Sequence, residues 1–287
     1  MIREEEANNF LKTLSELYNR IESINCNFSE EHEKLIKKYF HSDNKFHNIT
    51  GEGFFPTIER ITINKRVIGK NTRIDEVDKL KYPPAQFVEK YGRANLKHQS
   101  VFYGTFNFMT AVMEMNPEKG DLITVSRWTL KNGTDTLTVC PMFLSQPEDG
   151  SLNINLLNLY SSFVQELKKF PPHVAKLYFE LHRFYSKCFA REINSNNNHG
   201  YIFTAIMADR ILNEYKNGVI DAILYPSTKE ALRTENIVIK KNSFDNKYEL
   251  SETFEKRLID FSEDRDKYVF ERLGESSKIE RNRVYWK

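Results

Sequence analysis

The chain has 287 residues, which is enough to bury a full hydrophobic core as one large domain or as a domain with an appendage. Lysine and arginine total 42 against 40 acidic residues, so the net charge of +2 gives no electrostatic argument for a nucleic-acid partner. The three cysteines show no CxxC spacing, the chain starts with an acidic segment rather than a signal peptide, and no apolar run approaches the ~20 residues of a membrane span; a cytoplasmic protein is therefore expected.

The first 45 residues are expected to form a helical extension. Apolar residues recur at steps of three and four over residues 4–40, which predicts two amphipathic helices, the second of them capped at Ser29. The polar stretch 42–56 is typical of a linker, so the main domain is placed at 46–287. The extension is expected to pack on that domain or to mediate dimerisation.

The main domain is predicted to combine strands with helices, from period-two patterns in some segments and helical periods in others. The predicted elements are strands at 58–74, a short helix at 85–91, strands at 122–128 and 136–139, a helical insert at about 152–216, and strands at 219–225 and 236–240. The charged tail after Glu249 is predicted to be partly helical. This mixture predicts an α+β fold with strands on both sides of a helical insert.

Residues 92–115 are the most informative segment, and they predict a loop, a short strand and a helix. The helix, at 106–115, is apolar almost throughout but carries one carboxylate, Glu114. An ionised carboxylate in apolar surroundings costs several kcal/mol unless it is paired. Glu114 therefore lies either on a narrow wet edge of the helix or in a cleft where its charge is used. The nearby candidates to pair with it are Arg66, Arg73, Arg93 and Tyr103.

Several kinds of site are not predicted. The seven histidines show no metal-binding spacing, and the chain contains no GxGxxG, GxxxxGK[ST] or GxSxG motif. The remaining functional groups are arginine, tyrosine, glutamate and serine, which suit phosphates, a flat ring and an oxocarbenium-like centre. These groups would suit a nucleotide sugar such as NAD, although the same arrangement also permits a purely structural protein.

Short motifs in this part of the chain resemble the RES domain, a family named for its Arg, Glu and Ser residues. The motifs are Asn71-Thr72-Arg73-Ile74, Gly92-Arg93-Ala94-Asn95, Val101-Phe102-Tyr103, Ala111-Val112-Met113-Glu114 and Tyr225-Pro226-Ser227. They follow the order found in the family, and Tyr103 and Glu114 have its spacing. The resemblance covers about residues 58–240, apart from the helical insert.

The resemblance implies an ADP-ribosyltransferase-like mixed β core and an NAD-consuming toxin of a toxin–antitoxin pair. Such enzymes cleave the nicotinamide–ribose bond, with phosphate, water or a protein side chain as the acceptor, and NAD is their substrate. The expected partners are NAD, inorganic phosphate, an antitoxin protein and a second copy of the chain; no metal is expected. Two alternatives remain open, a protein ADP-ribosyltransferase and a RES-like interaction module without catalytic activity.

The resemblance also implies roles for individual residues. Glu114 would stabilise the ribose cation or bind its hydroxyls, and Ser227 would anchor nicotinamide or the ribose. Arg73 would hold phosphate, with Arg66 as its substitute on the same stretch. The remaining binding residues would be Tyr103 against the nicotinamide, Arg93 on phosphate or on Glu114, and Asn95 in the Gly-Arg-x-Asn loop.

Overall fold

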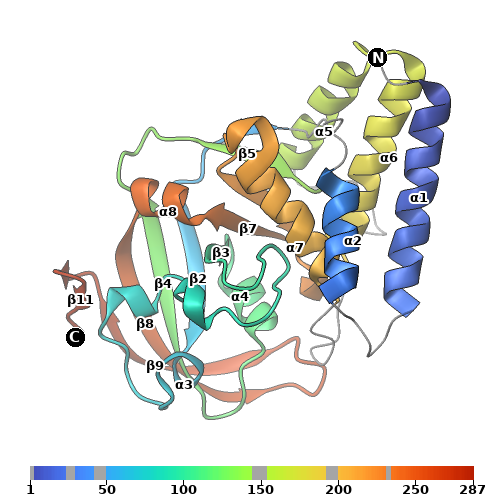
Figure 1. Ribbon diagram of the computed structural model, residues 1–287. Helices are drawn as coiled ribbons and strands as arrows, with labels where there is room; N and C mark the ends of the chain where they lie inside the picture. Colours follow the sequence, from blue (N-terminus) through green and yellow to red (C-terminus); the bar gives the residue numbers. More distant parts are fainter. Residues whose placement is uncertain (1–2, 24–29, 42–49, 144–153, 192–199, 231–233) are drawn as a thin grey trace.

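The structure, a computed structural model, describes residues 3–23, 30–41, 50–143, 154–191, 200–230 and 234–287 (Figure 1). Within these residues the fold is α+β, as predicted, and is built on one nine-stranded sheet with the order β1-β5-β6-β7-β3-β2-β4-β8-β9. All neighbouring strands are antiparallel except β5 and β6, which are parallel. A separate two-stranded ribbon, β10–β11, lies near the carboxyl end.

The helices are α1 (Glu4–Ser23), α2 (Glu30–His41), α3 (Asn64–Ile68), α4 (Phe108–Met115), α5 (Ile154–Leu167), α6 (Pro172–Phe189), α7 (Ile202–Asp209) and α8 (Lys241–Lys247). The strands are β1 (Gly51–Gly53), β2 (Thr57–Ile63), β3 (Val101–Thr105), β4 (Leu122–Leu130), β5 (Leu137–Pro141), β6 (Ala222–Pro226), β7 (Glu235–Lys240), β8 (Tyr248–Phe261), β9 (Tyr268–Ser276), β10 (Ile279–Glu280) and β11 (Arg283–Val284). None of the helices in these described segments combines the length and the apolar character needed to cross a bilayer.

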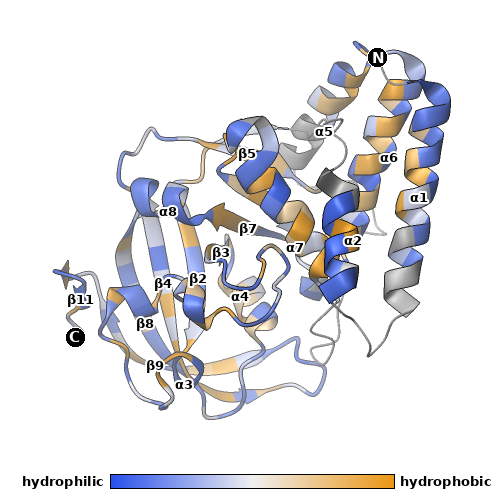
Figure 2. Ribbon diagram, viewed as in Figure 1, coloured by the Kyte–Doolittle hydropathy of each residue, from blue (hydrophilic) through white to orange (hydrophobic). Residues whose placement is uncertain are grey.

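Two groups of helices cover one face of the sheet. Figure 1 shows α1, α2, α6 and α7 gathered on one side of the molecule, and their apolar residues pack with β3, β5, β6 and β7 in one core cluster. Helix α4 packs instead on β2 and β4. In Figure 2 much of α7 is hydrophobic, and seven of its eight residues are buried. On the opposite face, α8 contributes Phe244, which stacks on Phe102 with ring centroids 3.8 Å apart.

The N-terminal helices are integrated into the same core as the predicted insert. Ala7 and Leu14 of α1 and Ile36 of α2 are buried in the cluster that contains residues of α6, α7 and the sheet. Packing of the extension on the main domain, one of the two expectations, is therefore observed. The predicted boundary at 45/46 and the cap at Ser29 lie outside the described residues.

The prediction of strands throughout 58–74 was wrong beyond Ile63. Residues Asn64–Ile68 form α3, which ends at Gly69 in the left-handed region (φ 71°). Asn64 is buried and donates a hydrogen bond to the carbonyl of Thr72, which folds the following loop back onto the helix. Tertiary contacts of this kind override a run of β-branched residues. The short helix predicted at 85–91 is a single 3₁₀ turn over Ala85–Phe87.

The prediction for the tail was also wrong. Instead of partly helical structure, the tail contains two long paired strands, β8 and β9, which extend the sheet beyond β4. Alternate residues such as Leu258 are buried, and most charged side chains of β8 lie on its outer face, with Glu255 as a buried exception. The other predicted strands are confirmed with shifted ends, and the predicted helical insert contains α5, α6 and α7.

Candidate active site

A cavity of about 270 Å³ opens where the two halves of the sheet separate. Strands β2 and β3 share a single registered pair, Glu59 with Thr105, whereas β3 pairs with β7 along its whole length. Where β2 and β3 do meet, Gly104 allows them to approach closely, because a Cβ at position 104 would lie 2.4 Å from Cγ2 of Ile58. The charged, amide and tyrosine side chains that line the cavity are Arg60, Arg93, Tyr103, Glu114, Tyr201, Tyr225 and Asn236.

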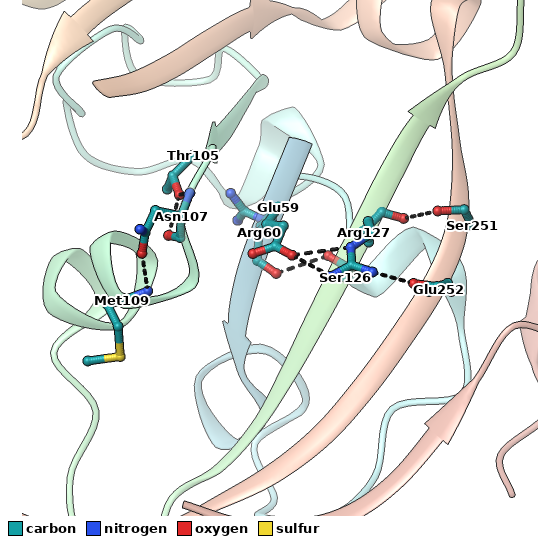
Figure 3. A network of polar contacts seen from close by, with 9 residues as sticks. All are labelled: Glu59, Arg60, Thr105, Asn107, Met109, Ser126, Arg127, Ser251 and Glu252. Carbon is teal, nitrogen blue, oxygen red and sulfur yellow. Dashed lines mark hydrogen bonds and ion pairs between the residues drawn. The ribbon is translucent and has the colours of Figure 1, made fainter. Parts of the chain in front are cut away.

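Helix α4 carries Glu114 to the cavity. Asn107 caps the helix, because its Oδ1 accepts a hydrogen bond from the backbone N–H of Met109 (Figure 3) and another from that of Thr110. The Thr105 hydroxyl bonds to both the N–H and the carbonyl of Asn107 and so fixes the turn from β3 into α4. One turn before Glu114, the Thr110 hydroxyl bonds to Glu230 and Thr234, which ties the helix to the segment after β6.

Glu114 is held by one of its two carboxylate oxygens. Its Oε1 accepts hydrogen bonds from the Ser227 hydroxyl, at 2.7 Å, and from the Asn236 amide, at 2.8 Å. Ser227 and Asn236 are both almost fully buried, and they come from the end of β6 and from β7. They offset the unfavourable position of a carboxylate in the last turn of a helix. No described residue bonds to Oε2, so this oxygen is free to act on a ligand.

Arg60 supplies positive charge to the same cavity from β2. Its Nη1 donates to the carbonyl of Tyr103, at 2.9 Å, and bridges the two strands where they separate. In Figure 3 Arg60 lies toward β3 and α4, whereas its neighbour Glu59 pairs with Arg127 on β4. Burial lowers the pKa of Arg60 to about 10, so the guanidinium remains cationic at neutral pH. Among the described residues it has no carboxylate partner, and a buried cation of this kind favours an anionic ligand.

Tyr103 and Asn95 hold the loop beside the cavity. The Tyr103 hydroxyl accepts from the backbone N–H of Ala94 and donates to Oδ1 of Asn95, at 2.8 and 2.9 Å. Gly92 lies against both side chains, and a Cβ there would be 2.2 Å from Oδ1 of Asn95. The hydroxyl of Tyr103 is therefore used within the fold, and burial raises its pKa. Only the ring of Tyr103 can contact a ligand. Asn95 bonds to the Tyr103 hydroxyl and does not line the cavity.

Arg93 connects this loop to the helical insert. Its Nη1 donates to the carbonyls of Phe189 and Arg191 and so caps the carboxyl end of α6. The guanidinium also lies 5.1 Å from the ring centroid of Tyr201 and 5.8 Å from that of Tyr225. The expected alternative of a direct pair with Glu114 is not observed. The insert contributes to the cavity through Tyr201, directly before α7.

Arg66 and Arg73 do not line the cavity. Arg66, on α3, donates to the carbonyls of Met115 and Asn116 and caps the end of the helix that carries Glu114. Arg73 donates twice to the buried carboxylate of Glu255 on β8, at 2.6 and 2.9 Å, and lies over the ring of Trp286. Since the strand ends at Ile63, the only arginine within β2 is Arg60, and neither Arg66 nor Arg73 lies on that strand.

The sequence interpretation missed Arg60, Asn236, Tyr201 and Tyr225 as site residues. The sequence contains a signal for Arg60, because this charged residue stands between Ile58 and Ile61 in a largely buried strand. Tyr225 stands in the motif Tyr225-Pro226-Ser227, of which only Ser227 was taken as a site residue. Asn236 and Tyr201 are brought in by long-range pairing and by the fold of the insert, which one sequence does not reveal. No protein-family model and no curated protein matches this chain.

The arrangement combines one available carboxylate oxygen, tyrosine rings and the guanidinium groups of Arg60 and Arg93, neither of which has a carboxylate partner among the described residues. A carboxylate of this kind can stabilise a developing cation, and an arginine can hold a phosphate. No group of side chains suited to a metal ion is found within the described segments.

Proposed function

We propose that this protein consumes NAD by cleaving the bond between nicotinamide and ribose, with Glu114 as the catalytic carboxylate. The observation that carries the proposal is the geometry of Glu114. One oxygen is fixed by Ser227 and Asn236, and the other is free in a cavity that also contains the unpaired cation of Arg60. The split sheet and the motif order support the further proposal of an ADP-ribosyltransferase-like RES fold.

In the proposed reaction, the bond from ribose C1′ to the pyridinium nitrogen breaks and its electron pair stays on nitrogen. Nicotinamide leaves as a neutral molecule, and the positive charge that develops on the ribose is stabilised by the free oxygen of Glu114. Arg60 would bind a phosphate oxygen of the substrate, and the ring of Tyr103 would pack beside the reacting end. Phosphate, water or a protein nucleophile would then attack C1′ and complete the transfer.

Product analysis tests this reaction and identifies the acceptor. Purified protein is incubated with NAD, with and without inorganic phosphate, and the products are identified by mass spectrometry. ADP-ribose phosphate would establish phosphorolysis, ADP-ribose would establish hydrolysis, and a mass increase on a protein would establish transfer. Intact NAD in every condition, with folded protein, would favour the interaction module instead.

We also propose that the protein is toxic to a host cell that lacks a restraining partner. Expression of the wild-type chain is expected to arrest growth, whereas Glu114→Gln is expected to be tolerated at the same expression level. A matched control is Glu118→Gln, which removes an exposed carboxylate paired with Lys65 outside the cavity and should still arrest growth. Equal toxicity of the Glu114→Gln variant would contradict a toxic effect through this site.

A further inference from the structure

Tyr225, at the end of β6, has a hydroxyl without a hydrogen-bond partner in the part of the chain that the structure describes. The residue is 6% exposed and lines the cavity, yet no described residue forms a hydrogen bond with its hydroxyl. Two other tyrosines of the sheet differ in this respect, since Tyr103 bonds to Ala94 and Asn95 and Tyr248 donates to the carbonyl of Phe55. Buried hydroxyls are normally paired, because an unpaired one loses its hydrogen bonds to water without replacement.

The surroundings of Tyr225 fix its ring and keep its hydroxyl neutral. The ring packs against Phe189, at 5.6 Å between centroids, and against the guanidinium of Arg93. Burial is the main reason that its pKa is raised well above 10, and the nearby Tyr103 and Glu114 raise it further while Arg93 acts in the opposite direction. At neutral pH the group is therefore a hydrogen-bond donor and acceptor close to Glu114, and it is not a general base.

The ligand group that fits this hydroxyl follows from the reaction proposed above, on which this inference rests. If Glu114 acts at ribose C1′, the leaving ring lies next to that carbon, near the rings of Tyr201 and Tyr225. That ring carries a carboxamide, whose oxygen accepts and whose nitrogen donates hydrogen bonds. We infer that Tyr225 recognises the carboxamide of the nicotinamide ring and so acts as a specificity-determining residue for the leaving group.

The test compares two probes, nicotinamide and ADP-ribose, in NMR titrations of the wild-type protein and of Tyr225→Phe. Loss of one hydrogen bond is expected to weaken nicotinamide binding about 3- to 10-fold and to leave ADP-ribose binding unchanged. Because no described residue bonds to the hydroxyl, the variant should also unfold at a temperature no lower than the wild type. Tyr248→Phe is the matched control and should show the opposite pattern, with lower thermal stability and unchanged nicotinamide binding.

Several results would overturn the inference. These are unchanged nicotinamide affinity in Tyr225→Phe, a loss confined to ADP-ribose, and no nicotinamide binding by the folded wild-type protein. A parallel assay of nicotinamide release from NAD separates this inference from the proposed function. Selective loss of nicotinamide binding in a protein that does not cleave NAD would support the recognition by Tyr225 and refute the cleavage.

Discussion

At the scale of single residues, the site is defined by which polar atoms the fold uses and which it leaves free. The polar groups of Tyr103 and Asn95 form hydrogen bonds within one loop, and one guanidinium nitrogen of Arg93 donates to the end of α6. Glu114 keeps one carboxylate oxygen free. Arg60 donates one nitrogen to the carbonyl of Tyr103 but has no carboxylate partner among the described residues. Ligand binding should therefore depend more on Arg60 than on the arginines that the sequence favoured.

Two arginine substitutions test this distinction. Arg60→Met is expected to weaken ADP-ribose binding about 10- to 100-fold, because it removes a hydrogen bond from a charged donor to a phosphate. Arg73→Met should leave that affinity unchanged and lower the free energy of unfolding by about 2 kcal/mol, because Glu255 is 3% exposed and loses its partner. Calorimetric titration and chemical denaturation measure the two effects. The reverse pattern would restore Arg73 as the phosphate-binding residue.

The residue scale also shows what one sequence can reveal about the site. Glu114 was identified because a lone carboxylate on an apolar helix needs a partner. Ser227 was expected to anchor nicotinamide or the ribose, and its hydroxyl instead donates to Glu114. Arg73 was chosen because Asn71-Thr72-Arg73-Ile74 resembles the early strand of the family with its arginine. In the structure α3 interrupts that stretch, and Arg73 pairs with Glu255. Asn236 could not be found in this way, since its position beside Glu114 depends on how β6 and β7 pair within the sheet.

At the scale of elements, the turn from β3 into α4 sets the position of Glu114. Asn107→Ala removes the helix cap and is expected to lower the free energy of unfolding by about 1 kcal/mol. Asn107→Asp keeps an acceptor at the same place and should retain most of that stability. Chemical denaturation of the two variants measures the difference. Equal losses in both would mean that the cap does not stabilise α4.

His182 on helix α6 makes the free energy of unfolding depend on pH. This residue is 2% exposed between Phe143 and Phe163, and its Nε2 has no partner among the described residues. Burial lowers its pKa to about 3 in the folded state, against a hydrogen bond to the backbone of Pro141 that acts in the opposite direction. The unfolded chain therefore binds a proton below about pH 6.5, where the folded protein does not.

Stability from His182 is complete above pH 6.5 and falls as the pH decreases toward 3. Between pH 7 and pH 5 the loss is expected to be roughly 2 kcal/mol from this residue. Chemical denaturation of the wild type and of His182→Asn at both pH values measures this loss of unfolding free energy. The variant should lose less on acidification than the wild type, whatever its stability at pH 7. Identical losses in the two proteins would contradict the assignment.

Elements with a strong local pattern in the sequence were predicted, and elements with a weak one were missed. The helices of the insert and the strands β4, β5 and β7 were predicted because their apolar periods are regular over the whole element. Strands β8 and β9 were missed because their exposed face is densely charged, and charged residues at alternate positions obscure a strand when only one face is buried. Strand β9 lies at the edge of the sheet, which explains its charged composition, whereas β8 lies between β4 and β9.

At the scale of the whole molecule, the N-terminal helices and the insert form one core with the sheet. Leu14 of α1 is 1% exposed in the cluster that also contains Ile206 of α7 and Tyr225 of the cavity. Leu14→Ala is expected to lower the free energy of unfolding by about 2–5 kcal/mol and to shift a single thermal transition as a whole. A separate early transition, with the main one unchanged, would mean that α1 unfolds independently.

The central claim is that Glu114 performs the cleavage of NAD, and the initial rate of nicotinamide release tests it most directly. Gln at position 114 can still accept the hydrogen bonds of Ser227 and Asn236, so Glu114→Gln removes the charge and preserves the contacts. The wild-type protein is expected to release nicotinamide, and Glu114→Gln to do so at least about 100-fold more slowly at unchanged thermal stability. Equal rates in the two folded proteins, or no release by the wild type, would contradict the account.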